Sequence, residues 1–174
     1  MTEIQSVSTE QPRQLDSTEV AILMERLRSE QSVGAAAAAG AVAAGFGAVA
    51  WAAVTVFTRY QIGFMAVGVG LLVAWAVRTR GKGVDRVFAL IGAGLSLAGC
   101  LLGNLLAACG MVAQDEGVGF FAILAHIDLQ MAKELMASMF SPMDLLFYGI
   151  AVYEGYRLSI RRLTRAEMAS RLAG

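Results

Sequence analysis

Residues 33–57 form an unbroken apolar run that contains no Asp, Glu, Lys or Arg. A helix needs about 20 predominantly apolar residues to cross the hydrocarbon core of a bilayer, and this run exceeds that length. The whole chain agrees, because 57% of its 174 residues are hydrophobic and only 16% are charged. In soluble domains about half of the residues are hydrophobic and about a quarter are charged. The sequence therefore predicts an integral membrane protein.

Three further segments pass the same length test. They are residues 61–77, 87–113 and 142–160. Only three residues separate the first two apolar segments, which predicts a tight antiparallel hairpin. We therefore expect an all-α integral membrane protein whose four-transmembrane-helix bundle occupies residues 33–160.

The segment 142–160 is the least apolar of the four, because it contains Asp144, Glu154 and Arg157. A helix that began at residue 142 and ended at Val152 would be ~16 Å long, too short to cross the hydrocarbon core. Two alternatives follow. Either the segment spans the membrane with Glu154 in or near the hydrocarbon, or it lies in the interface.

The beginning of this segment has the residues of a helix N-terminus. Ser141 can cap the helix, Pro142 suits its first position, and Asp144 lies in the first turn near the positive end of the helix dipole. Asp144 therefore has a structural explanation that requires no catalysis.

Basic residues are distributed unevenly around the four segments. Residues 114–141 contain one, Lys133. The opposite side holds Arg26, Arg28, Arg78, Arg80, Lys82, Arg86, Arg161, Arg162, Arg165 and Arg171. Cytoplasmic loops carry the excess of Lys and Arg. We therefore expect both termini in the cytoplasm and residues 114–141 outside, with Arg59 as a minor exception in the outer turn.

The remaining segments lie outside the predicted membrane domain. Residues 1–15 have no apolar period and predict a disordered tail. Residues 16–31 predict a cytoplasmic amphipathic helix, which either docks a cytoplasmic protein partner or rests on the membrane surface. Residues 119–140 predict an amphipathic segment on the outer side, since apolar residues recur there at helical spacing. Residues 161–174 form a basic cytoplasmic tail.

Small residues recur at every fourth position in two of the apolar segments. The first segment contains Gly40, Ala44 and Ala48, and the third contains Gly92, Ser96, Cys100, Asn104 and Ala108, with Gly99 and Gly103 beside them as a GxxxG pair. Lipid supplies no hydrophobic force between helices, so close backbone approach along such stripes holds a bundle together. We expect these two helices to pack closely, with each other or across a subunit boundary.

Polar residues within the apolar segments are the candidates for function. Asn104 either provides an interhelical hydrogen bond or belongs to a solute path. Glu154 is either functional, since intramembrane acids are costly, or half of an interfacial pair with Arg157. The candidate polar path comprises Asn104, Tyr148, Asp144 and Glu154.

Several function classes are excluded by composition. The formal net charge is zero, and nucleic-acid binding needs a clustered basic surface. Cys100 and Cys109 point to opposite sides of one helix, and His126 has no second histidine nearby, so we expect no metal site. The chain contains no nucleophile, phosphate-loop or dinucleotide motif. We expect no enzymatic activity and no cofactor.

Three motifs occur together: YQIGFMAVGVG from Tyr60, GCLLGN from Gly99, and SPMDLLFYGIAVYEGY from Ser141. They resemble a loose group of small uncharacterised bacterial four-span membrane proteins, and the resemblance covers residues 60–159. It implies a multi-pass protein of the bacterial inner membrane and assigns no activity.

The informative residues are therefore packing residues. They favour a non-enzymatic membrane protein that acts through assembly, as a homo-oligomer, or through partner binding. The alternative is a small transporter or channel subunit with a polar path involving Asn104 and Glu154.

Overall fold

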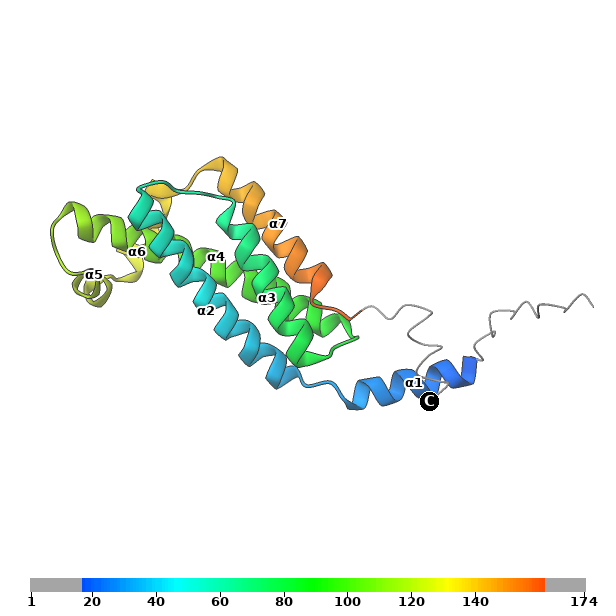
Figure 1. Ribbon diagram of the computed structural model, residues 1–174. Coiled ribbons are helices and arrows are strands. Elements are labelled where there is room, and N and C mark those ends of the chain that lie inside the picture. Colours follow the sequence, from blue (N-terminus) through cyan, green and yellow to red (C-terminus); the bar gives the residue numbers. More distant parts are fainter. Residues whose placement is uncertain (1–16, 162–174) are drawn as a thin grey trace, which may run out of the picture.

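The computed structural model describes residues 17–161, and this part of the chain is all-helical (Figure 1). Its helices are α1 (Ser17–Ser29), α2 (Val33–Thr58), α3 (Met65–Gly81), α4 (Arg86–Asp115), α5 (Phe120–His126), α6 (Leu129–Met139) and α7 (Pro142–Leu158). The tail expected at residues 1–15, the first residue of the helix predicted over 16–31, and residues 162–174 of the predicted basic tail lie outside the described residues.

Helices α2, α3, α4 and α7 form the bundle (Figure 1). Helices α3 and α4 contact each other and both remaining helices, whereas the backbones of α2 and α7 do not contact each other. Helices α2 and α7 therefore lie on opposite sides of the α3–α4 pair. Helix α1 lies at one end of this bundle, and α5 and α6 lie at the other (Figure 1).

Two helices, α2 and α4, are long and apolar enough to cross a membrane by length and composition. A third span results if α6 and α7, which meet at an angle of 106°, are counted as one bent span. Helices α3 and α7 have 17 residues each, or ~25 Å at 1.5 Å per residue. The sequence predicts four spans. The lengths and composition of the helices support two or three of them.

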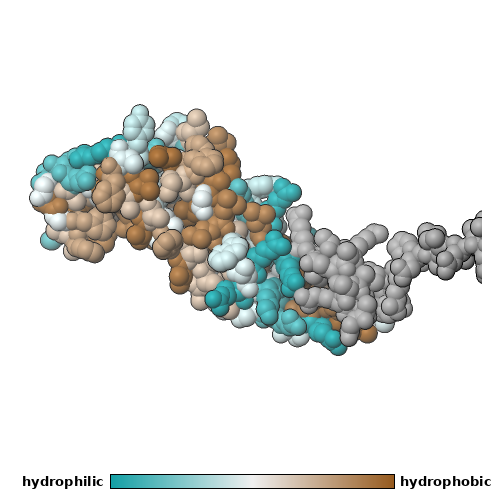
Figure 2. Space-filling view, viewed as in Figure 1, coloured by the Kyte–Doolittle hydropathy of each residue, from teal (hydrophilic) through white to brown (hydrophobic). Residues whose placement is uncertain are grey.

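The distribution of small and large apolar side chains in this bundle is the reverse of that in a soluble protein. Its interior consists mostly of small side chains, and the alanines 36, 48, 66, 74, 89, 107, 108 and 151 are all fully buried. Large apolar side chains point outward instead, among them Phe46, Phe57 and Trp75. The face shown in Figure 2 is largely hydrophobic over the bundle. Such a surface suits lipid, because small interior residues allow helices to approach closely there.

The predicted hairpin between the first two apolar segments is longer in the structure. Helix α3 begins at Met65 rather than near residue 61. Residues 61–64 form turns instead, in which Met65 N donates to Ile62 O and Ala66 N donates to Gly63 O. A Cβ at Gly63 would lie 2.6 Å from Cδ2 of Phe147. The connection is therefore packed against α7 before the helix starts.

The predicted outer amphipathic segment is divided into two helices. Helix α5 ends at His126 and α6 begins at Leu129. A new helix begins after Asp128, because its carboxylate accepts a hydrogen bond from Met131 N at 2.7 Å and thereby caps α6. A capping side chain satisfies an otherwise free N–H group of the first turn.

Both ends of the bundle are joined by polar contacts. At the end where α2 stops, Arg59 pairs with Asp115 of α4 at 2.5 Å. At the other end, Asp85 pairs with Arg28 at 3.4 Å and accepts a hydrogen bond from Gln31 at 3.2 Å. The predicted exception to the charge rule, Arg59, therefore has an acidic partner.

Candidate functional site

Four polar side chains from three parts of the chain meet inside the bundle. Gln61 precedes α3, Asn104 lies on α4, and Asp144 and Tyr148 lie on α7; we call these four residues the polar cluster. Gln61 Nε2 donates to Asn104 Oδ1 at 3.1 Å and lies 3.5 Å from Asp144 Oδ2. Asn104 is 1% exposed and Asp144 3% exposed, so the cluster belongs to the interior.

Asp144 has the structural role that the sequence predicted for it. The backbone N–H of Ser141 donates to Asp144 Oδ2 at 2.9 Å, and the hydroxyl of Ser141 accepts from Met143 N at 3.3 Å. With Pro142 in the first turn, these contacts form a capping box. The predicted helix start at Ser141 is therefore confirmed.

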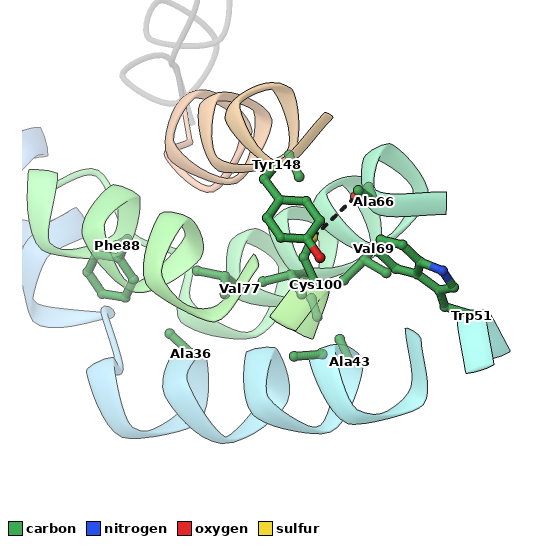
Figure 3. Close-up of a cluster of buried hydrophobic side chains, with 13 residues drawn as sticks. Ala36, Ala43, Trp51, Ala66, Val69, Val77, Phe88, Cys100 and Tyr148 are labelled. Carbon is green, nitrogen blue, oxygen red and sulfur yellow. Dashed lines mark hydrogen bonds between the residues drawn. The ribbon is translucent and has the colours of Figure 1, made fainter. Parts of the chain in front are cut away.

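Tyr148 extends from α7 into the bundle, where its hydroxyl lies beside Cys100 (Figure 3). Its ring meets Trp51 of α2 edge-on, with centroids 6.2 Å apart, and Phe140 at 6.3 Å. Trp51 and Tyr148 thus join α2 and α7, whose backbones do not contact each other. Cys100 donates weakly to the carbonyl of Ala66, with 3.8 Å between sulfur and oxygen.

Several buried polar atoms of α2, α4 and α7 have no hydrogen-bond partner among the described residues. They are Asn104 Nδ2, Tyr148 Oη, Trp51 Nε1, Thr55 Oγ1 and Ser96 Oγ. Buried polar atoms in proteins are nearly always hydrogen-bonded to protein or to ordered water.

Glu154 lies apart from the polar cluster. It lines a surface hollow with Arg78, Tyr153 and Arg157. The interpretation of Glu154 as one half of an ion pair with Arg157 is wrong, because Arg157 Nη1 donates to the hydroxyl of Tyr153 at 2.9 Å. Among residues 17–161, Glu154 takes part in neither of the two ion pairs.

Close helix contacts separate the polar cluster from Glu154. A Cβ at Gly70 of α3 would lie 2.8 Å from Cα of Ala151 on α7. A Cβ at Gly155 would lie 2.6 Å from the carbonyl oxygen of Gly92 on α4. The structure therefore brings Asn104, Asp144 and Tyr148 together, but it does not bring Glu154 into the same site.

The small residues of α4 lie on three interfaces, with α2, with α3 and with α7. Gly103 faces α2, since a Cβ there would lie 3.3 Å from Ala48 Cα, and a Cβ at Gly99 would lie 2.9 Å from Val69 Cγ1 of α3 and 3.1 Å from Ala44 Cβ of α2. Gly92 faces α7, and Cys100 and Asn104 contact the residues at the start of α3. Ala108 is fully buried. Gly40 lies against Val77 and Leu95.

Sequence reasoning missed Gln61, Trp51 and Thr55. Gln61 carried a signal, because it is a polar residue at the start of an apolar segment. Trp51 is fully buried, although an amphipathic ring of this kind is typical of the headgroup level of a membrane. Trp51 packs against Tyr148, which lies almost a hundred positions further along the chain, so no local sequence pattern indicates this contact.

Metal chemistry has no donor set in the part of the chain that the structure describes, where no three His, Cys, Asp or Glu side chains could hold an ion together. Cys100 and Cys109 are buried and free. His126 is exposed, and its Nδ1 lies 2.8 Å from the carbonyl oxygen of Ala122.

Comparisons with protein-family models, curated proteins and solved structures give no match for this chain.

Proposed function

We propose that the chain is a non-enzymatic four-span protein of a bacterial inner membrane that acts through assembly with other membrane helices. Helices α3 and α7 are short, but a bilayer adapts to a mismatch of a few ångströms at modest cost. Both helices also expose large apolar side chains, including Leu71 and Trp75 on α3 and Leu145 and Leu146 on α7. Because α3 packs against α2, α4 and α7, and α7 also packs against α4, all four helices would enter the membrane as one unit.

The observation that supports assembly is a groove between α2 and α3. It has a volume of about 610 Å³ and is lined by five alanines, Ala35, Ala38, Ala39, Ala43 and Ala76, together with exposed Phe46 and Trp75. Helix interfaces in membranes are enriched in small residues because these let a second backbone approach. The groove therefore suits a transmembrane helix, and the simplest source of that helix is a second copy of the chain.

Two differently tagged copies, co-expressed and extracted in mild detergent, test this proposal. We expect them to purify together, and we expect Ala38→Leu to abolish co-purification because the new side chain fills the groove. Ala41→Leu is the matched control, since Ala41 is exposed on the same helix but does not line the groove. Equal behaviour of the two variants would contradict assembly through this groove.

The alternative is a transporter or channel subunit with a polar path through Asn104 and Glu154. The unpartnered atoms Asn104 Nδ2, Tyr148 Oη and Ser96 Oγ favour it, because Asn104 and Ser96 belong to α4 and Tyr148 to α7, and these helices pack together. A path would have to open where Gly70 now contacts Ala151. Flux into proteoliposomes that is lost in Glu154→Gln would support this alternative and count against assembly as the function.

A cytoplasmic partner is a further element of the proposal. Helix α1 projects from the end of the bundle (Figure 1), and the link between α1 and α2 is held to the α3–α4 loop, where Ser32 N donates to Gly81 O at 3.2 Å. Deletion of residues 1–31 separates the two roles. If this helix serves only a cytoplasmic partner, the two tagged copies should still purify together, because we propose that assembly depends on the groove alone.

A further inference from the structure

A hollow on the surface between α3 and α7 is not used by the proposed assembly or by the polar cluster. It has a volume of about 590 Å³, and its lining includes Arg78 of α3 and Ile150, Tyr153, Glu154 and Arg157 of α7. These residues place two guanidinium groups and one carboxylate around a single opening. The hollow lies toward the end of the bundle that carries most of the basic residues.

Glu154 is the unusual member of this group. Its Oε2 is buried and has no hydrogen-bond partner among the described residues. Arg157 does not neutralise it, because that guanidinium bonds the Tyr153 hydroxyl and lies 5.8 Å from the centre of the Tyr153 ring. A buried carboxylate oxygen without a donor costs free energy, so a donor that reached this carboxylate from the hollow, which Glu154 lines, would stabilise it.

Aromatic residues indicate the depth of the hollow in a membrane. Tyr153 and Tyr156 are 57% and 42% exposed, and Trp75 on α3 is 66% exposed. Tyr and Trp side chains exposed in this way are enriched at the level of the lipid headgroups. Ile150 supplies an apolar wall. The hollow therefore opens where a lipid headgroup joins its acyl chains.

We propose that this hollow binds the headgroup of a phospholipid that carries a primary ammonium, namely phosphatidylethanolamine. Arg78 and Arg157 would bind the phosphate, as arginines in basic pockets between membrane helices do. The ammonium would donate to the Glu154 carboxylate, and an acyl chain would lie along Ile150. This inference needs the bundle to be in a membrane, but it does not depend on assembly through the α2–α3 groove.

The charge pattern distinguishes this lipid from two common relatives. Phosphatidylcholine has the same net charge, but its quaternary ammonium has no N–H group to donate to Glu154. Phosphatidylglycerol satisfies the arginines, but it brings no cation to the carboxylate. If the hollow recognised only the negative charge of a lipid, a glutamate in the same lining as two arginines would weaken binding.

Retention of defined lipids by the purified full-length protein tests the proposal. Native mass spectrometry would compare phosphatidylethanolamine, phosphatidylcholine and phosphatidylglycerol with identical acyl chains. We expect phosphatidylethanolamine to be retained about tenfold better than phosphatidylcholine, the size of effect of one hydrogen bond to a charged group. Glu154→Leu should abolish this preference because leucine offers no acceptor oxygen, and Arg78→Gln should weaken retention of phosphatidylethanolamine and phosphatidylglycerol together.

Arg86→Gln is the control, because Arg86 is exposed in the first turn of α4 and does not line the hollow. Equal retention of phosphatidylethanolamine and phosphatidylcholine by the wild-type protein would overturn the proposal, as would stronger retention of phosphatidylglycerol. An unchanged preference in a folded Glu154→Leu protein would also overturn it. If that variant does not fold, the wild-type comparison of headgroups decides alone.

Discussion

Gln61 donates its side-chain amide to Asn104 across 3.1 Å and thereby joins the turn before α3 to the buried face of α4. Helix α3 begins at Met65, four residues later than the apolar pattern predicts, and Gln61 lies in the turn that precedes it. The Gln61 side chain is directed into the bundle toward Asn104 and Asp144, and the turn that carries it packs against α7. A polar residue thus sets the register of the second predicted span relative to the third.

A double-mutant cycle would measure the strength of this contact. Interhelical hydrogen bonds in membranes average ~0.6 kcal/mol and reach about 1.7 kcal/mol. We expect Gln61→Ala and Asn104→Ala to couple by an amount in that range in reversible unfolding in detergent. Gln114→Ala, at an exposed position near the end of α4, should not couple to Asn104→Ala. Zero coupling between Gln61 and Asn104 would show that the contact stabilises nothing.

Gly70 and Gly68 provide a matched pair on α3. A Cβ at Gly70 would lie 2.8 Å from Cα of Ala151, whereas nothing lies within 4 Å of one at Gly68. We expect Gly70→Ala to destabilise the protein by about 1–3 kcal/mol, as overpacking does. Gly68→Ala should be neutral or stabilising by up to about 1 kcal/mol because alanine favours helix. Thermal unfolding in detergent checks both, and equal shifts would contradict the α3–α7 contact.

Gly103 tests the contact between α4 and α2. A Cβ there would lie 3.1 Å from Cε3 of Trp51, so we expect Gly103→Leu to cost about 1–3 kcal/mol or more by overpacking. Leu101→Ile is the control, since Leu101 is 39% exposed. Because Gly103 packs within one chain, the loss should occur in thermal stability before it occurs in oligomer size. Indistinguishable variants would mean that this face of α4 contacts lipid.

The proposed topology is tested by reporter fusions at Lys82, at Gln130 and after the last residue. The excess of Lys and Arg around the α3–α4 loop predicts a cytoplasmic location for Lys82 and for the C-terminus. Gln130 in α6 should lie outside. Activity of a periplasmic reporter at Lys82 would overturn this orientation. Fusions at Lys82 and Gln130 on the same side would contradict a fully spanning α4.

Features encoded within a few turns of helix were predictable from the sequence. The apolar runs define α2 and α4 within two residues at each end, because the length of an uncharged segment is a local property. The capping box at Ser141 followed from residues three positions apart. Which residues are small enough for close packing was likewise evident from spacing alone.

The partner of each helix face was decided only by the tertiary structure. Spacing could not show that Gly103 faces Trp51, that Gly92 faces α7, or that Glu154 lies away from Asn104. The rotation of a helix about its axis depends on all its interfaces at once, and these join residues far apart in the chain. Sequence therefore determined which side chains could pack or bind, and the bundle determined which of them meet.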